Sequence, residues 1–379
     1  MQDRLVVIGA GVVGSAVAWR AAQDRLAAEV VLLDPEPGSG ASWVAGGMLA
    51  PITEAWPGER ELLELGAASL ERWPAFAEAV ATASGREVGL RREGTIAVVV
   101  DAADREDLDR VVALLHEWGR DAERLTAREA RRREPALGPA VRAGIAVPDD
   151  LAVDNRLLLT ALRAAGERAG VVLRRERAHR VVDSGGRVVG VETGDGVLEA
   201  GRVVVAAGAW SASLHPALDG LVRPVKGEVL RIRARPGSLP PPTRTVRAAV
   251  AGRAVYAVPR DADRLVLGAT QYEVGFDADV TVGGVRALLN DAERVLPGIA
   301  DYALEESAAS FRPGSPDNMP LLGPVGPEGL LAATGHGRNG VLLTALTAEA
   351  LADALAGREP PAVAVPAAAS RFVRQEVPS

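Results

Sequence analysis

Short apolar runs and an amphipathic stretch follow one another at the start of the chain. The runs LVVIG (5–9) and EVVLLD (29–34) are rich in β-branched residues, as buried parallel strands are. Between them, VVGSAVAWRAAQ repeats its apolar residues with helical spacing. The pattern predicts a strand–helix–strand unit in this region.

The same two periodicities recur through the rest of the chain in an interleaved order. They predict helices over 61–84, 104–119 and 154–170, and strands at 92–100, within 171–211 and from 223 to 275. The C-terminal part returns to the first pattern, with a strand at 330–335, a glycine loop and a helix. We therefore expect an α/β protein whose two domains are built from separated segments.

Composition narrows the classes of function. The chain has 379 residues, of which 48% are hydrophobic and 25% charged, as in ordinary globular proteins. It has no cysteine, which excludes disulfides, thiolate metal sites and a cysteine-linked cofactor. Its four histidines lack metal-binding spacing, so no metal site is expected.

Charge and hydropathy argue against two kinds of partner. The net charge of −7 and the scattered basic residues are unlike a nucleic-acid-binding surface. No apolar run reaches the ~18 residues that a membrane span needs, and the first residues do not resemble a signal peptide. We expect a cytoplasmic protein that binds neither nucleic acid nor a membrane.

Glycines after the first strand carry a dinucleotide-binding fingerprint. Gly9, Gly11 and Gly14 form G-x-G-x-x-G between a strand and a helix, and the next strand ends in Asp34. The glycines allow a tight turn and a close approach to a pyrophosphate, which the helix N-terminus attracts. The acid accepts a hydrogen bond from a ribose hydroxyl. In this frame, dinucleotide binding is favoured over a merely structural unit.

Two glycine-rich loops leave more than one interpretation open. In GSGASWVAGGMLAP (38–51), Gly46 and Gly47 would allow backbone to approach a flat ring closely, but the loop could also be a flexible connector. The loop GHGRNG (335–340) precedes a predicted helix, so its donors could face the N1–C2=O edge of a flavin. A glycine-rich turn without a ligand is the alternative.

Arg312 lies in an unusual setting, SFRPGSPDNMPLLG (310–323). A guanidinium is costly to desolvate, so a segment that only built a core would not place one beside Phe311 and an apolar run. The position indicates that Arg312 has a specific role, and a structural salt bridge is one possible role.

Several motifs together resemble one family. GAGVVGSAVAWRAA, GASWVAGGMLAPITE, VVVAAGAWS, YAVPR…VLGAT, FRPGSPDNMPLLG and GHGRNGVLL occur in this order over nearly the whole chain. They resemble the D-amino-acid oxidase superfamily of FAD-dependent oxidoreductases, and most of all its glycine oxidase branch of the thiamine-biosynthesis type. The resemblance implies a glutathione-reductase-type FAD-binding Rossmann domain with an interleaved α+β substrate domain on a mixed sheet.

The resemblance also implies how the chain divides. The FAD-binding domain is expected to comprise residues 1–85, 150–222 and 306–379. The substrate domain is expected to comprise residues 86–149 and 223–305.

The family further implies roles for individual residues. Arg312 matches the arginine that grips the substrate carboxylate, since a planar guanidinium can form two parallel hydrogen bonds with it. Tyr256 matches the tyrosine whose hydroxyl joins that site, although a core tyrosine is the alternative. Arg338 matches an arginine near flavin and substrate. The expected FAD contacts are Gly9, Gly11, Val12, Val13, Gly14, Asp34, Pro35, Ala41, Ser42, Gly46, Gly47, Met48, Ala178, Ala207, Gly208, His336, Gly337, Arg338, Asn339, Gly340, Val341 and Leu342.

The implied reaction is the oxidative deamination of a small amino acid. Non-covalent FAD would accept a hydride from glycine, sarcosine or a small D-amino acid, and oxygen would then yield hydrogen peroxide. A role in thiamine biosynthesis and a homo-oligomeric state are expected. The alternatives are a D-amino-acid or secondary-amine oxidase or dehydrogenase of the same fold, and a non-catalytic flavin-binding subunit.

Overall fold

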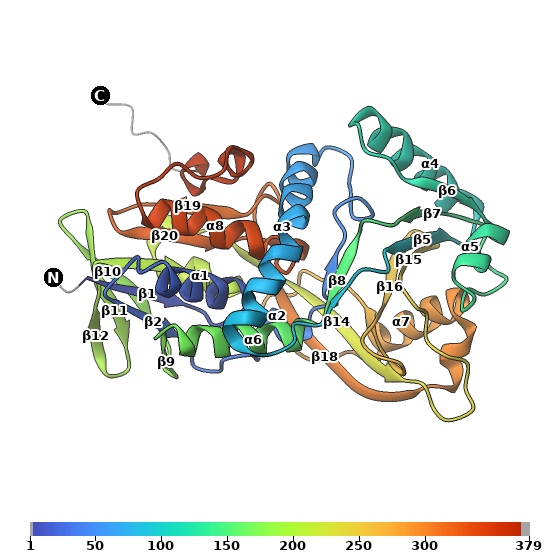
Figure 1. The fold of residues 1–379 in the computed structure, drawn as a ribbon, viewed down its shortest axis with the longest axis horizontal. Helices are drawn as coiled ribbons and strands as arrows, with labels where there is room; N and C mark the ends of the chain where they lie inside the picture. Colours follow the sequence, from blue (N-terminus) through green and yellow to red (C-terminus); the bar gives the residue numbers. More distant parts are fainter. Residues whose placement is uncertain (1–2, 373–379) are drawn as a thin grey trace.

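A computed structural model describes residues 3–372 (Figure 1). One half of the molecule is built on a six-stranded sheet of order β19-β20-β13-β1-β2-β9. Its neighbouring strands are parallel except for the antiparallel pair β19 and β20. The strands are β1 (Arg4–Ile8), β2 (Glu29–Leu33), β9 (Val172–Arg174), β13 (Arg202–Val205), β19 (Leu321–Pro324) and β20 (Leu330–Thr334).

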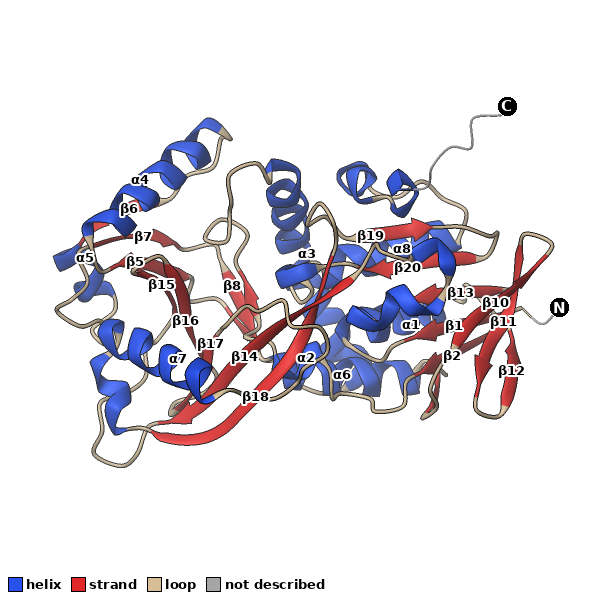
Figure 2. Ribbon diagram, turned by 180° about the vertical axis from the view of Figure 1, so that it is seen from behind, coloured by secondary structure: helices blue, strands red, loops and turns tan. Residues whose placement is uncertain are grey.

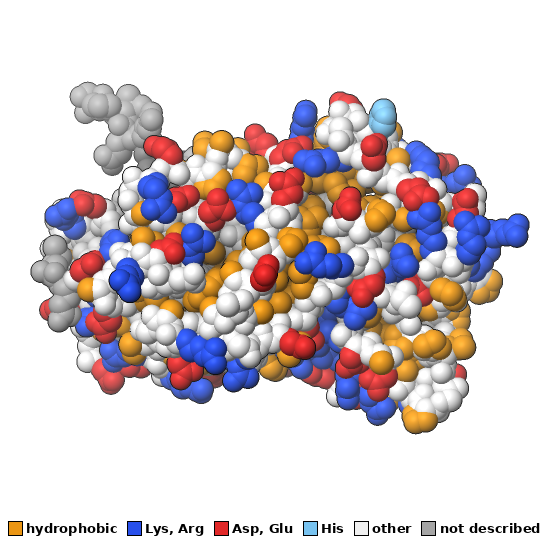
Figure 3. Space-filling model, viewed as in Figure 1, with side chains coloured by type: hydrophobic (Ala, Val, Ile, Leu, Met, Phe, Trp, Pro, Cys, Tyr) orange, Lys and Arg blue, Asp and Glu red, His pale blue; other side chains and the backbone are white. Residues whose placement is uncertain are grey.

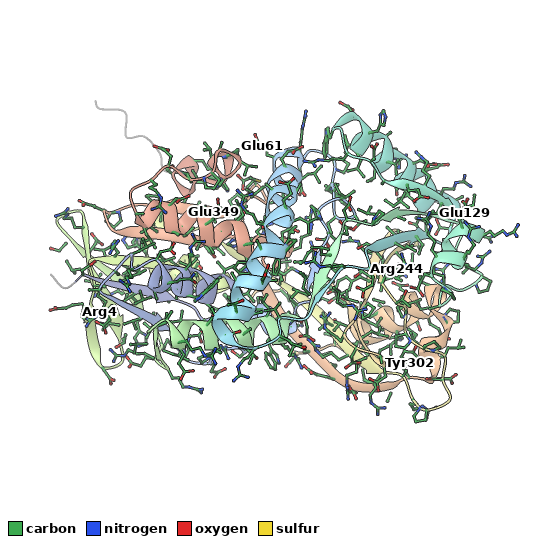
Figure 4. The ribbon with its side chains drawn as sticks, in the orientation of Figure 1. Arg4, Glu61, Glu129, Arg244, Tyr302 and Glu349 are labelled. Atoms are coloured by element: carbon green, nitrogen blue, oxygen red, sulfur yellow. The ribbon has the colours of Figure 1, made fainter. Side chains whose placement is uncertain are left out.

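Helices cover this sheet and confirm most of the helical spacing in the sequence. The helix α1 (Val12–Gln23) packs between α6 (Asn155–Arg168) and α8 (Thr344–Leu355). The long helix α3 (Arg60–Ser84) crosses α6 and α8, and Arg72 of α3 forms an ion pair with Glu349 of α8. Figure 4 labels Glu349 where α8 passes beside α3. The apolar faces of these helices pack together in one buried cluster, and two further clusters cover the two faces of the sheet.

The other half is built on an eight-stranded mixed sheet of order β18-β14-β17-β16-β15-β5-β7-β6. Only β15 and β5 are parallel neighbours. Its strands are β5 (Thr95–Val99), β6 (Glu123–Thr126), β7 (Ala143–Val147), β14 (Arg223–Arg233), β15 (Thr245–Val250), β16 (Arg253–Pro259), β17 (Arg264–Gly268) and β18 (Ala303–Gly314). Figure 2 shows β14 and β18 as long neighbouring strands that run from beside α7 toward the six-stranded sheet.

Shorter elements complete the two halves. The helix α7 (Val282–Val295) packs on one face of the large sheet, and α4 (Ala102–Glu117) and α5 (Ala127–Arg133) lie at its far end. A small sheet of order β3-β8-β4 joins the halves, and a hairpin sheet β10-β11-β12 lies outside the six-stranded sheet. Their strands are β3 (Met48–Leu49), β4 (Leu90–Arg91), β8 (Leu151–Val153), β10 (Arg180–Ser184), β11 (Arg187–Thr193) and β12 (Gly196–Glu199), and the short helix α2 (Ala41–Val44) precedes β3.

One sequence-based expectation is wrong, and one predicted boundary falls within a strand. The predicted domain boundary at residue 306 falls inside β18, which pairs with β14 of the large sheet as far as Gly314. The C-terminal end of the predicted segment 306–379 lies outside the described residues. The expectation that GHGRNG leads directly into a helix is wrong: Gly337–Asn339 form a 3₁₀ turn, and α8 begins only at Thr344.

The described surface shows no single-sign charge patch on the face in Figure 3, where acidic and basic side chains are interspersed. Within residues 3–372, no helix combines the length and the apolar character that crossing a bilayer requires.

Candidate active site

The parallel strands bring the predicted cofactor residues to one edge of the six-stranded sheet. Gly9 follows β1, Asp34 follows β2, Ala207 follows β13 and Gly335 follows β20. Because these strands are parallel neighbours, their carboxyl ends lie side by side, where open α/β sheets bind their ligands. Segments separated by more than 300 residues in the chain therefore meet at this edge.

The glycines of the fingerprint are required by close packing. A side chain on Gly9 would overlap the backbone oxygen of Ala206, and Gly9 has a φ of 105°. A side chain on Gly14 would overlap the carbonyl oxygen of Gly9. The first turn of α1 therefore lies directly against the end of β1, as a pyrophosphate site of this kind needs.

The start of α1 and the end of β2 supply complementary groups for a dinucleotide. Gly11 caps α1 without a side-chain hydrogen bond, so the N–H groups of Val13 and Gly14 in the first turn stay available for phosphate oxygens. Val12 N donates to Ser42 Oγ at 3.0 Å. Asp34 accepts from Ala10 N at 2.7 Å and Glu36 N at 2.8 Å, which holds its carboxylate beside the turn. These groups fit FAD.

The loop at Gly46–Met48 is fixed between the two halves and does not behave as a free connector. Met48 opens β3 and pairs with Ala152 of β8. The Gly46 carbonyl accepts from Arg260 Nη2 at 2.6 Å, and a side chain on Gly46 would lie 2.7 Å from the Tyr256 ring. The backbone therefore packs directly against Tyr256.

Tyr256 and Arg312 lie across glycines on one face of the large sheet. Tyr256 of β16 pairs with Gly268 of β17, and a side chain on Gly268 would overlap the Tyr256 phenol. In the same way, a side chain on Gly227 of β14 would overlap the Arg312 guanidinium. The neighbouring strands β14 and β17 thus have glycines where the Arg312 guanidinium and the Tyr256 phenol lie. An isolated glycine inside a strand often marks such a close approach.

Arg312 has no acidic partner within 4.0 Å among residues 3–372. Its Nη1 donates to the carbonyl oxygens of Thr270 at 3.1 Å and Lys226 at 3.4 Å. The structure therefore gives no support to the structural salt bridge. A half-buried guanidinium without a counter-ion is suited to an anionic ligand.

Arg338 differs from Arg312 in this respect. Its Nη2 donates to Glu59 Oε2 at 2.5 Å and to the Glu54 carbonyl at 3.2 Å. The turn that carries it lies beside the end of β18 through a bridge between Gly314 and His336. Arg338 is thus near the edge of the site, but its charge is already paired.

Burial keeps the Tyr256 hydroxyl protonated. Burial raises the pKa of Tyr256, while the positive charge of Arg312 opposes that shift. A neutral phenol remains a hydrogen-bond donor beside the guanidinium. The pair therefore offers donors to a carboxylate.

Buried charges behind the sheet hold the backbone that positions Arg312. Lys226 and Glu228 are 1% and 0% exposed, with Nζ 3.9 Å from Glu228 Oε1. Glu228 also accepts from Thr270 Oγ1 at 3.1 Å and Thr281 N at 2.7 Å. These contacts fix Thr270, whose carbonyl oxygen accepts from Arg312.

His336 and Asn339, both predicted FAD contacts, are buried in the turn before α8. The His336 ring bonds Thr347 Oγ1 at 3.0 Å, and burial lowers the pKa of His336 to about 4, so the ring is neutral. The Asn339 Oδ1 atom is buried without a partner. Gly208 and Gly337 face open space, because no atom lies within 4 Å of a side-chain position on either. The remaining predicted contacts Val13, Pro35, Ala41, Ala178, Gly340, Val341 and Leu342 lie in or next to the segments described above, Ala178 between β9 and β10.

Asp150 is a buried acid next to the site. It is 0% exposed, accepts from Thr53 Oγ1 at 2.9 Å and leaves Oδ1 without a partner. Burial raises the pKa of Asp150 to about 7, against 3.8 for the free side chain, while the Thr53 hydrogen bond opposes the shift. The folded state therefore binds this proton more tightly than the unfolded state does.

Asp150→Asn is expected to become increasingly stabilising, relative to the native protein, as the pH rises from 5 to 8. In the native protein, this acid lowers the unfolding free energy progressively between about pH 4 and pH 7, because the unfolded chain loses its proton first. An amide keeps the shape without titrating, so the difference should grow by at most about 3 kcal/mol. Thermal melting of both proteins at several pH values measures it. A difference independent of pH would contradict the prediction.

Known proteins resemble this chain over most of its length. The family described as "FAD dependent oxidoreductase", DAO, matches residues 4–354. A glycine oxidase from Geobacillus kaustophilus is 34% identical over 94% of this chain and 93% of its own length. A bifunctional protein ThiO/ThiG from Synechocystis is 34% identical over 92% of this chain but 51% of its own length. This chain thus spans about half the length of such bifunctional relatives.

Solved structures agree with the sequence matches. The crystal structure of glycine oxidase from Geobacillus kaustophilus has a TM-score of 0.89 and 32% identity, covering 98% of this chain and 100% of that one. The iminodiacetate oxidase from Chelativorans sp. has a TM-score of 0.84 and 27% identity, covering 96% and 98%. The predicted fold class is confirmed.

The fold and the cofactor edge of the six-stranded sheet define a dinucleotide-dependent enzyme built from two interleaved halves. The chain belongs to the DAO family of FAD-dependent oxidoreductases. Its cofactor is FAD, and the predicted family is confirmed.

Sequence reasoning missed several residues beside this site. Gly227 and Gly268 could have been suspected, since an isolated glycine inside a strand often marks a close approach. Glu54 and Arg247 gave no signal, because 193 residues separate the two partners of their ion pair.

Proposed function

We propose that this protein oxidises glycine, or a closely related small amino acid, to the α-keto acid with release of ammonia or an amine. The observation that carries the proposal is Arg312, a half-buried guanidinium without an acidic partner among the described residues, next to the protonated hydroxyl of Tyr256. Such a pair suits the carboxylate of an amino acid. The glycine oxidases that resemble this chain over nearly its whole length support the same substrate class.

The residues would contribute by binding and orientation. Arg312 and Tyr256 would hold the carboxylate, and the backbone at Gly46–Met48 would lie against the cofactor ring. FAD supplies the hydride acceptor when bound. Loss of a hydride and a proton from the amino acid gives an imine, which water converts to the α-keto acid, glyoxylate in the case of glycine. Oxygen is the expected final acceptor and is reduced to hydrogen peroxide.

A second candidate is the oxidation of a secondary amine such as sarcosine. The likeness to an iminodiacetate oxidase at 27% identity favours including this class. The role in thiamine biosynthesis is supported by the relatives named ThiO/ThiG. The homo-oligomeric state and the cytoplasmic location remain predictions from the sequence, as do the domain boundaries and the residue roles.

Anaerobic mixing of the FAD-loaded protein with glycine, sarcosine and D-alanine tests the function. We expect glycine or sarcosine to bleach the flavin absorbance, because the hydride of the substrate passes to FAD. Acid precipitation should release the flavin into the supernatant, because the chain has no cysteine to hold it covalently. If no amino acid reduces the bound flavin, the proposed function is wrong, and a non-catalytic flavin-binding subunit explains the protein better.

A further inference from the structure

An ion pair flanks Tyr256 on the side opposite to Arg312. Arg247 of β15 is the register partner of Tyr256, so both side chains project from the same face of the sheet. The Arg247 guanidinium donates through Nη1 to Glu54 Oε1. The two side chains are 19% and 12% exposed, so the pair is largely withdrawn from water.

Glu54 reaches this position because of the loop that carries it. The chain passes from the Gly46–Met48 segment through β3 and then turns at Thr53, which is held by Asp150. The Glu54 carbonyl accepts from Arg338 Nη2 at 3.2 Å. The residue is therefore fixed between the expected ring of the cofactor and the substrate sheet.

Only one oxygen of the Glu54 carboxylate is used. Oε1 accepts from Arg247, and Oε2 accepts no hydrogen bond from residues 3–372. The negative charge of Glu54 adds to the burial that raises the pKa of Tyr256, which agrees with a carboxylate close to the phenol. A carboxylate has two oxygens with room for several donors, so Oε2 can accept from a ligand.

Donors and an acceptor lie on this face. Arg312 is positive and Tyr256 is a neutral donor, while Glu54, although paired with Arg247 through Oε1, keeps Oε2 to accept a hydrogen bond. An α-amino acid carries a carboxylate that accepts and an amino group that donates on one carbon. Complementary charges on both groups would fix the α-carbon between them.

We infer that Glu54 binds the amino group of the substrate and that Arg247 is a positioning residue that orients the Glu54 carboxylate. The inference rests on the proposed function and narrows its substrate class. The site takes amino acids whose nitrogen keeps at least one N–H to donate, which includes primary and secondary amines. Fully substituted nitrogens, as in N,N-dimethylglycine when neutral or in a quaternary betaine, lack the donor or the space.

The test compares ligands with and without an amine in Glu54→Gln and native FAD-loaded protein. Glutamine keeps the size but loses the charge, so KM for glycine should rise by roughly 10- to 100-fold, the worth of a charge-assisted hydrogen bond. The dissociation constant of acetate, read from the flavin spectrum, should change by less than about threefold, since acetate has no amine. Glu305→Gln serves as the matched control, because Glu305 also pairs with an arginine of this sheet, Arg233, but at an exposed position.

A second variant separates amine binding from anchoring of the loop. Arg247→Met leaves the Glu54 carboxylate in place, so its KM for glycine should rise less than that of Glu54→Gln. Equal weakening of glycine and acetate in Glu54→Gln, an unchanged KM for glycine, or an Arg247→Met variant that matches Glu54→Gln would each overturn the inference. Native protein whose flavin is not reduced by any amine would instead overturn the proposed function.

Discussion

Arg312→Ala is expected to lower kcat/KM for glycine by roughly 30- to 4,000-fold while leaving FAD bound. The range follows from about 2–5 kcal/mol for removing one partner of a buried charge pair, at about 1.4 kcal/mol per tenfold. The fold should survive, because Arg312 donates only to carbonyl oxygens of Thr270 and Lys226. Steady-state kinetics and the flavin spectrum measure the two effects separately.

Matched comparisons decide whether the loss comes from the carboxylate. Arg312→Lys should restore only part of the activity, since an ammonium keeps the charge but not the planar fork. Amines without a carboxylate should be poor substrates of the native protein and should lose much less. Arg233→Ala removes an arginine from the same pair of strands at an exposed position and should leave kinetics unchanged. Equal losses for amino acids and simple amines, with a lower melting temperature, would contradict the assignment.

The sequence predicted the cofactor half of the molecule well, for physical reasons. Its strands are short apolar runs and its helices are strongly periodic, so the pattern of the residues and their burial in the structure agree. The glycine fingerprint is also local: Gly9, Gly11 and Gly14 take their roles within one strand–helix turn. Patterns of this kind predict local structure without any knowledge of distant contacts.

The substrate half could be predicted only in outline. The sequence indicates a specific role for Arg312. Its partners, the carbonyl oxygens of Lys226 and Thr270, are set by how β18 packs beside β14 and β17. The resemblance places Arg338 near flavin and substrate, but its ion pair with Glu59, 279 residues away, gives no signal in the sequence. The pair of Glu54 and Arg247 likewise arises from the packing of one half on the other. Sequence reasoning had no access to contacts of this range.

The helix after GHGRNG shows a different kind of failure. Periodicity extended the helix back to Val341, because the apolar residues there are buried like those of α8. The 3₁₀ turn at Gly337–Asn339 intervenes, so the backbone donors near the cofactor edge belong to a tight turn. Burial alone cannot distinguish the two conformations.

Gly47→Val is expected to remove most of the bound FAD. Gly47 has a φ of 75°, a region that a β-branched residue occupies only at a cost of about 1–3 kcal/mol. A side chain there would also overlap the carbonyl oxygen of Val153, whose N–H donates to the Gly47 carbonyl at 2.8 Å. The strain lowers stability, whereas relief of the overlap with β8 must shift the loop out of the position in which it would meet the cofactor, and this shift lowers the FAD affinity.

The measurement is the FAD dissociation constant, from flavin fluorescence during titration of the apoprotein, with thermal melting to show that the variant folds. Gly185→Val is the matched control: Gly185 has a φ of 59° in the β10–β11 hairpin, and no atom lies within 4 Å of its side-chain position. That variant carries similar backbone strain away from the sheet edge that binds the cofactor, so it should lose some stability and keep its FAD. A backbone that must lie against the flavin ring cannot shift without weakening FAD binding. If Gly47→Val melts like the control and still binds FAD with native affinity, the loop at Gly46–Met48 is only a connector.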